Sequence, residues 1–130
     1  MIITTSPDNQ KALALQKMAE ITLERLHKTE IIEYPSNSLI DYYDCIHKLL
    51  EAVAARDGFK TTGEGAHQEL IEHVAKKYKL SEQTRLLLQQ LRDYRNRISY
   101  EGFSINPNFI LQNEEKIENV IAQLKNMLSR

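Results

Sequence analysis

The chain is poor in the residues that interrupt or cross-link a fold, and these shortages exclude several classes of protein. Its 130 residues include only four Gly, three Pro and one Cys. The single cysteine, Cys45, has no second cysteine to pair with, which excludes an internal disulfide framework. With so few Gly and Pro, and with abundant Leu, Ala, Glu, Lys, Gln and Arg, the composition favours helices over a β-sandwich or barrel.

Long apolar runs and an excess of charge of one sign are also missing. No run approaches the roughly 18 apolar residues of a membrane-spanning helix, and no basic segment followed by an apolar one is found at the N-terminus. We therefore expect a cytoplasmic protein that makes no membrane contact. The formal net charge is −1, from 17 basic and 18 acidic residues, which excludes a strongly basic surface. Hydrophobic residues make up 42% of the chain, as in an ordinary folded domain, and we expect a single domain over residues 1–130.

Capping residues and apolar spacing predict five helices. Ser6 is expected to cap the first helix, with Pro7 at its first position. Ser36, Asn37 and Ser38 can each cap the second helix, which should stop at Gly58. The predicted segments are about 7–29, 38–57, 66–78, 82–99 and 107 to the C-terminus.

The same pattern predicts an all-α protein. No alternating run of four or more residues is present, so we expect no sheet. Residues 31–34 are expected to form a connector and residues 59–65 a loop. In the first helix, Ala14, Met18, Ile21 and Arg25 share one stripe, opposite a charged face. Since short connections favour antiparallel neighbours, the prediction is an up-down four-helix bundle with one additional short helix in its second crossover.

Charge is concentrated in one segment. Residues 76–97 carry seven Lys or Arg against two acidic residues. Such a local field could attract phosphates, or it could be a solvated face whose charges pair with neighbouring acids. Arg95 is the most informative member, because it falls on the apolar stripe formed by Leu88, Leu91 and Ile98. An arginine there must reach a buried acid, or the stripe must open onto a cleft or a subunit interface. Arg92 and Arg97 point elsewhere and are expected at the surface.

Histidine and cysteine spacing does not favour a metal site. No two of the four histidines lie four residues apart, and we expect neither a metal nor a cofactor. His47 lies next to the apolar face of the second helix and is expected in the core or at an interface. Cys45, beside the same face, is expected to be a small buried hydrophobe. Gly63 and Gly65 lack the lysine and the preceding strand of a phosphate-binding loop.

The segment from Arg95 to Gly102 resembles the motif region of the HEPN superfamily, the higher eukaryotes and prokaryotes nucleotide-binding domains. Their signature is an Arg, often followed by a polar residue, with a His about five residues later. Arg95 occupies the Arg position, Asn96 the polar position and Tyr100 the His position. The segment from Ser38 to His47 is similar to the aromatic-rich second helix of many members. Gly58 followed by His67 and Leu70 resembles their next crossover.

The resemblance implies an all-α, homodimeric domain that binds RNA or a nucleotide. Many HEPN domains are metal-independent RNases or toxins, and they often pair with a small nucleotidyltransferase in toxin–antitoxin modules. In the RNases, the Arg and the His assist attack of a ribose 2′-hydroxyl on the adjacent phosphate. The implied site comprises Arg95, Asn96 and Tyr100 as the motif, with Arg92, Arg97 and His47 as further binding residues.

Because a tyrosine stands at the motif's His position, three hypotheses about the function are open. A tyrosine has an ordinary pKa of about 10 and is a poor general base near neutral pH, so the first hypothesis is a binding domain with weak or absent RNase activity. The second is an active ribonuclease in which Tyr100, His47 or His67 replaces the histidine. The third is a structural partner subunit in which Arg95 holds an acid at an interface.

Overall fold

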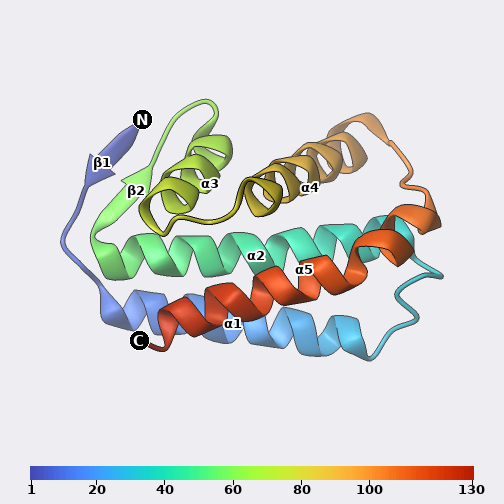
Figure 1. The fold of residues 1–130 in the computed structure, drawn as a ribbon, viewed down its shortest axis with the longest axis horizontal. Coiled ribbons are helices and arrows are strands. Elements are labelled where there is room, and N and C mark those ends of the chain that lie inside the picture. Colours follow the sequence, from blue (N-terminus) through green and yellow to red (C-terminus); the bar gives the residue numbers. More distant parts are fainter.

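Five α-helices and a small sheet make up the chain (Figure 1), and a computed structural model describes all 130 residues. The elements are β1 (Ile2–Thr4), α1 (Asn9–His27), α2 (Pro35–Asp57), β2 (Phe59–Thr61), α3 (Ala66–Lys77), α4 (Glu82–Glu101) and α5 (Pro107–Leu128). Long helices alternate in direction, with α3 and α4 together forming the third arm (Figure 1). The predicted all-α bundle of four long helices and one short helix is confirmed. None of the helices combines the length and the apolar character needed to cross a bilayer.

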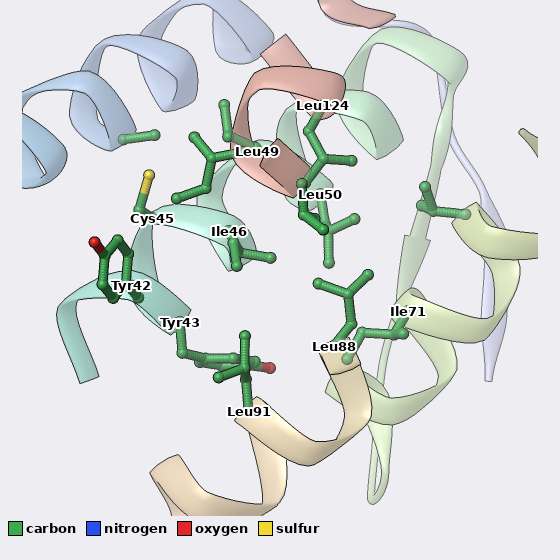
Figure 2. Close-up of a cluster of buried hydrophobic side chains, with 14 of the residues drawn as sticks. Tyr42, Tyr43, Cys45, Ile46, Leu49, Leu50, Ile71, Leu88, Leu91 and Leu124 are labelled. Atoms are coloured by element: carbon green, nitrogen blue, oxygen red, sulfur yellow. The ribbon is translucent and has the colours of Figure 1, made fainter. Parts of the chain in front are cut away.

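Helix α2 is the centre of the bundle, because it contacts each of the other four helices. Twelve of its 23 residues are buried, against three of 19 in α1 and three of 20 in α4. Figure 2 shows Ile46, Leu49 and Leu50 of α2 facing side chains from α3, α4 and α5. Cys45 is buried among them, as predicted. The core is therefore organised around one helix, and polar residues on α2 lie close to several neighbours at once.

Most helix ends follow the predicted chemistry. Ser81 caps α4 by accepting a hydrogen bond from the Thr84 amide at 3.1 Å, and Asn106 caps α5 ahead of its first-turn proline. Helix α2 ends at Gly58 and α4 at Gly102, with φ values of +83° and +67°. These left-handed conformations favour glycine, which explains why the helices stop there.

Two helix starts differ from the prediction. Asp8, rather than Ser6, caps α1, and its carboxylate accepts from the Lys11 amide at 2.9 Å. The preceding backbone is held extended on the end of α2, because the Thr5 amide donates to Gly58 O and the Asp8 amide to Ala55 O, both at 2.8 Å. Helix α2 begins at Pro35 without a side-chain cap.

The serines expected to cap α2 have other roles. Ser38 donates to the carbonyl of Ile31 at 2.7 Å. Ser36 accepts from the amide of Ile105 at 3.0 Å, 69 residues away. Both hydroxyls therefore tie the first turn of α2 to residues outside the helix instead of capping it. Pro35, at the first helical position, has no backbone N–H that would need a cap.

The inward face of α1 also differs from the prediction. Met18 and Ile21 are 52% and 56% exposed, while Ala12, Ala19 and Leu26 are buried. Helix α1 makes its extensive contacts with α2 alone. Small side chains let the two helices approach closely, so the alanine face is buried and the bulkier stripe is left outside.

A two-stranded antiparallel sheet is present where none was expected. Strand β1 pairs with β2 in the register Ile2 to Thr61, Ile3 to Lys60 and Thr4 to Phe59. Each strand has three residues, too few for an alternating pattern to be recognised in sequence. The pairing joins segments that are distant in the chain, so no local signal reports it. The predicted loop of residues 59–65 therefore begins with a strand.

We predict that Gly58→Ala destabilises the fold more than Gly63→Ala does. Both glycines have φ near +80°, but a Cβ on Gly58 would meet the Thr5 carbonyl oxygen at 2.7 Å, whereas one on Gly63 meets nothing within 4 Å. The backbone conformation alone should cost about 1–2 kcal/mol at either position. The contact should raise the loss at Gly58 to about 2–4 kcal/mol. Urea denaturation measures both values, and equal losses would contradict the close approach.

Candidate functional site

Polar and titratable side chains from α2, α3 and α4 meet on one side of the bundle, and we call this group the histidine–arginine site. It consists of Tyr43, His47 and Glu51 from α2, His67 from α3, and Arg92 and Arg95 from α4. The three α2 residues are spaced four apart, which places them on one face of that helix. His67 is the second residue of α3, where the chain enters the helix after Gly65.

The two histidines form the centre of the site. Their ring centroids are 4.0 Å apart, although 20 residues separate them in sequence. The His47 side chain is 15% exposed, which agrees with the predicted position beside the apolar face. Its Nε2 lies 3.2 Å from a carboxylate oxygen of Glu51, while its Nδ1 is buried and has no hydrogen-bond partner. The Glu51 carboxylate therefore lies beside Nε2, whereas Nδ1 has no partner.

Both imidazoles are held in the neutral form. Burial, followed by the positive charges of His67, Lys48 and Arg95, lowers the pKa of His47 to about 3. Burial also lowers the pKa of His67, opposed by the Glu51 carboxylate and assisted by Arg95. Near neutral pH the pair therefore carries lone pairs and N–H groups rather than positive charge.

Tyr43 is a buried neighbour of the two histidines. It is 1% exposed, and its hydroxyl lies 3.5 Å from Nδ1 of His67. Burial raises the pKa of Tyr43 to about 12, against the opposing charges of Arg92 and Arg95. The hydroxyl thus stays protonated and is a donor toward His67. Figure 2 shows the Tyr43 hydroxyl pointing away from that of Tyr42, so two adjacent tyrosines serve different sides of α2.

Arg95 lies at the edge of the site with a partner that does not fully satisfy it. Its side chain is 24% exposed, and its Nε is 3.7 Å from a carboxylate oxygen of Asp44. That Nε is buried and makes no hydrogen bond. Burial raises the pKa of Asp44 even though Arg95 acts to lower it. The acid that the sequence argument required is present, but it is 43% exposed rather than buried, and the guanidinium retains a free donor.

The other predicted site residues separate into two groups. Arg92 is half-buried, and its Nε donates to Gln89 Oε1 at 2.8 Å; its charge also acts on Tyr43 and His67. Arg97 is directed elsewhere, with its guanidinium carbon 4.1 Å from the ring centroid of Phe103. Asn96 is half-buried next to Arg95. Tyr100 is 78% exposed in the last turn of α4, five residues and about 140° around the helix from Arg95.

Two of the seven basic residues in segment 76–97 are paired with close acids. Lys77 pairs with Asp57 at 3.0 Å, and Arg85 pairs with Glu72 at 3.0 Å and with Glu82. For Lys77 and Arg85, this agrees with the interpretation of a solvated face whose charges pair with neighbouring acids. Arg95 has only Asp44, at 3.7 Å, and Arg92 forms no ion pair, as is also the case for Lys76, Lys79 and Arg97, so the unpaired positive charge of the segment includes the arginines near the histidines.

Sequence reasoning missed Glu51 and Tyr43 as site residues and did not bring the two histidines together. The recurrence of Tyr43, His47 and Glu51 at every fourth position was a usable signal for a shared polar face. The approach of His67 depends on how α3 docks, which no local pattern encodes. No group of three or more His, Cys, Asp or Glu side chains is placed to hold a metal ion.

Comparison with known proteins gives no assignment. No protein-family model, curated protein or solved structure significantly matches the chain. The site is therefore interpreted from its own geometry, together with the motif resemblance.

We predict that His47 makes the fold sensitive to mild acid. Its pKa is about 3 in the folded state and about 6.5 in an unfolded chain, so between these values the unfolded state binds more protons. Stability therefore falls as pH decreases below about 6.5. In His47→Gln this contribution is absent, and the stability difference between wild type and variant should shrink by about 2 kcal/mol between pH 7 and pH 4.5. Urea denaturation at both pH values tests this, and parallel pH profiles would contradict it.

Proposed function

We propose that the chain is a HEPN-like domain that binds the phosphate groups of RNA or of a nucleotide at the histidine–arginine site. The observation that carries the proposal is that the Arg95 side chain, 24% exposed, has only Asp44 at 3.7 Å as an acid partner, while its charge acts on two imidazoles whose pKa values are lowered. The motif resemblance independently selects Arg95.

The site has the donors that a phosphate needs. A guanidinium presents several N–H groups in a planar fork that matches phosphate oxygens. Arg95 is partly buried, so its interaction with a phosphate is less screened than that of an exposed arginine. A weakly bound Asp44, 3.7 Å away, is a partner that an incoming phosphate can displace at small cost.

The neutral imidazoles suit the same ligand. A neutral histidine donates through one nitrogen and accepts through the other, so the pair can contact both a phosphate oxygen and a ribose hydroxyl. A bound phosphate also favours the protonated imidazole, because opposite charges stabilise each other at short range. Ligand binding and protonation of the site should therefore be coupled.

We predict that Arg95→Ala weakens binding of a short single-stranded RNA by about 1–3 kcal/mol, the usual range for hydrogen bonds to charged groups. Arg97→Ala is the matched control, because it removes the same charge from the same helix at a side chain that stacks on Phe103. Fluorescence anisotropy at low ionic strength measures both affinities. If Arg97→Ala abolishes binding and Arg95→Ala leaves it intact, RNA binds elsewhere on a general electrostatic surface.

The resemblance further suggests a homodimer with a nucleotidyltransferase as a possible second partner, in a toxin–antitoxin type of module. Tyr100 is 78% exposed and lies about 140° around α4 from Arg95, so it is accessible to a second copy of the chain. In a dimer whose α4 helices face each other, Tyr100 could reach the partner's site, which would reconcile its motif position with its exposure.

A second candidate, a metal-independent ribonuclease, is favoured by the juxtaposition of His47 and His67. Nδ1 of His47 has no hydrogen-bond partner but is buried, so this candidate requires the imidazole to turn toward the surface, where it could remove the proton of a ribose 2′-hydroxyl, whose oxygen would then attack the adjacent phosphorus. The bond to the 5′-oxygen breaks, and protonated His67 supplies the proton that this oxygen needs. Arg95 would neutralise charge on the phosphorane. The products are a 2′,3′-cyclic phosphate and a 5′-hydroxyl.

This candidate makes a prediction about pH. Catalysis needs neutral His47 and protonated His67. The pKa of His47 is about 3, and that of His67 lies below its ordinary value of 6.5, so both conditions hold best in mild acid. RNA cleavage in a chelating buffer should therefore be faster at pH 5 than at pH 7.5. His67→Ala should abolish it, whereas Tyr100→Phe should not. Absence of cleavage at both pH values would leave the binding proposal and remove the ribonuclease.

A further inference from the structure

The molecule has a cavity beside the two histidines and a larger groove between α4 and α5. The cavity has a volume of about 340 Å³ and lies among the β1–α1 connection, α2, β2 and the start of α3. The groove has a volume of about 440 Å³ and shares no lining residue with the cavity or with the histidine–arginine site. It is therefore a separate surface, whose chemistry is independent of the proposed phosphate site.

The walls of the groove are two helices that pack on α2 rather than on each other. Helices α4 and α5 both contact α2 extensively but hardly contact one another, and they run in opposite directions (Figure 1). Leu87 of α4 and Val120 of α5 line the groove and are buried. Both walls are thus anchored in the core, so the groove is a fixed feature of the fold.

Side-chain amides line the groove, and charge is almost absent from it. Helix α4 carries seven charged residues and α5 carries five, yet Lys116 alone among them lines the groove. Asn113 donates to the carbonyl of Phe109 at 2.9 Å, and the other four amide residues are exposed. Most of the amide donors and acceptors are therefore open to a ligand. Five of the ten lining residues are Asn or Gln: Gln83, Gln90, Asn113, Asn119 and Gln123.

The amides favour an extended peptide chain as the occupant. A side-chain amide complements a peptide group, because each offers an N–H donor and a C=O acceptor. The backbone groups of a helix are already paired within the helix, whereas those of an extended segment without a sheet partner are free to bind. The chain's own strands, β1 and β2, pair with each other, so we assign the extended segment to another protein.

The rest of the lining indicates the length and the character of this segment. Asn113 and Gln123 are ten residues apart on α5, which corresponds to about 15 Å along the helix and to about four or five residues of extended chain. The buried Leu87 and Val120 offer a floor for one apolar side chain. Lys116 is the single charge and no acid lines the groove, so an acidic residue is favoured over a basic one.

We propose that the groove between α4 and α5 binds an extended segment of a partner protein that carries one apolar and one acidic residue, and that the side-chain amides recognise its backbone. This function does not depend on phosphate binding. It adds a protein-interaction surface to the chain, on residues that the histidine–arginine site does not use.

The test is a selection of random ten-residue peptides displayed on phage, with the wild-type chain as bait. The enriched peptides should share an acidic residue and an apolar one, without the apolar spacing of three and four residues that marks a helix. Synthetic copies are then measured by fluorescence anisotropy. Methylation of two central backbone nitrogens should weaken binding at least about tenfold, because it removes donors that the groove amides accept.

Variants of the groove show whether these peptides bind there. Gln90→Ala and Gln123→Ala should each weaken binding about threefold to tenfold, the effect of losing roughly one hydrogen bond. Gln112→Ala is the matched control and should equal wild type, because Gln112 is an exposed amide on α5 that does not line the groove. Lys116→Glu should reverse the charge preference, so that a peptide with Lys in place of its acidic residue binds more tightly than the original.

Three results would overturn the proposal. The selection could enrich no peptide, or the enriched peptides could bind Gln90→Ala and Gln123→Ala as tightly as wild type, which would place them outside the groove. Peptides that are helical when bound and tolerate backbone methylation would show that the groove holds a helix instead.

Discussion

The burial of α2 is the constraint on which the rest of the structure depends. Every other helix contacts it, so any polar side chain on α2 that faces inward must be satisfied by a neighbour or kept uncharged. Tyr43 and His47 illustrate both solutions. Tyr43 keeps its proton and lies within reach of His67, and His47 stays neutral beside Glu51. The chemistry of the candidate site is thus a consequence of where α2 lies, because the same burial that stabilises the bundle also keeps His47 neutral.

The end of α2 determines where the cavity forms. Gly58 turns the chain into β2, and the backbone from Thr5 to Asp8 is hydrogen-bonded onto this turn. The β1–α1 connection therefore lies against the last turns of α2, while β2 leads into the loop before α3. The cavity is the space enclosed among these segments. Lys60 of β2 and Lys11 of α1 both line this cavity.

The sequence allows the helices to be predicted but not their docking. Ser81, Asn106, Gly58 and Gly102 are local signals, and each acts within one turn of its own position, which is why these boundaries agree with the structure. The inward face of α1 could not be inferred from the size and polarity of its residues. Alanines are buried there because α2 packs closely against α1, not because alanine is the most hydrophobic residue of the helix. The β1–β2 pairing and the meeting of His47 with His67 depend on contacts between distant segments, and a single sequence carries no local trace of them.

The position of Arg95 on α4 could be predicted from sequence more fully than the docking of the helices. Its acid partner is more distant than those of Lys77 and Arg85. Along the basic segment, Lys77 and Arg85 are bound closely by acids from their own or neighbouring helices, so their fields are largely cancelled nearby. Arg95 has only Asp44, at 3.7 Å, and burial raises the pKa of that carboxyl. Protonating either histidine beside these arginines is unfavourable, and a bound anion removes that penalty. Arg95 thus has a more distant acid partner than Lys77 or Arg85 and lies near two neutral histidines, and this combination is the physical reason for placing the proposed phosphate there.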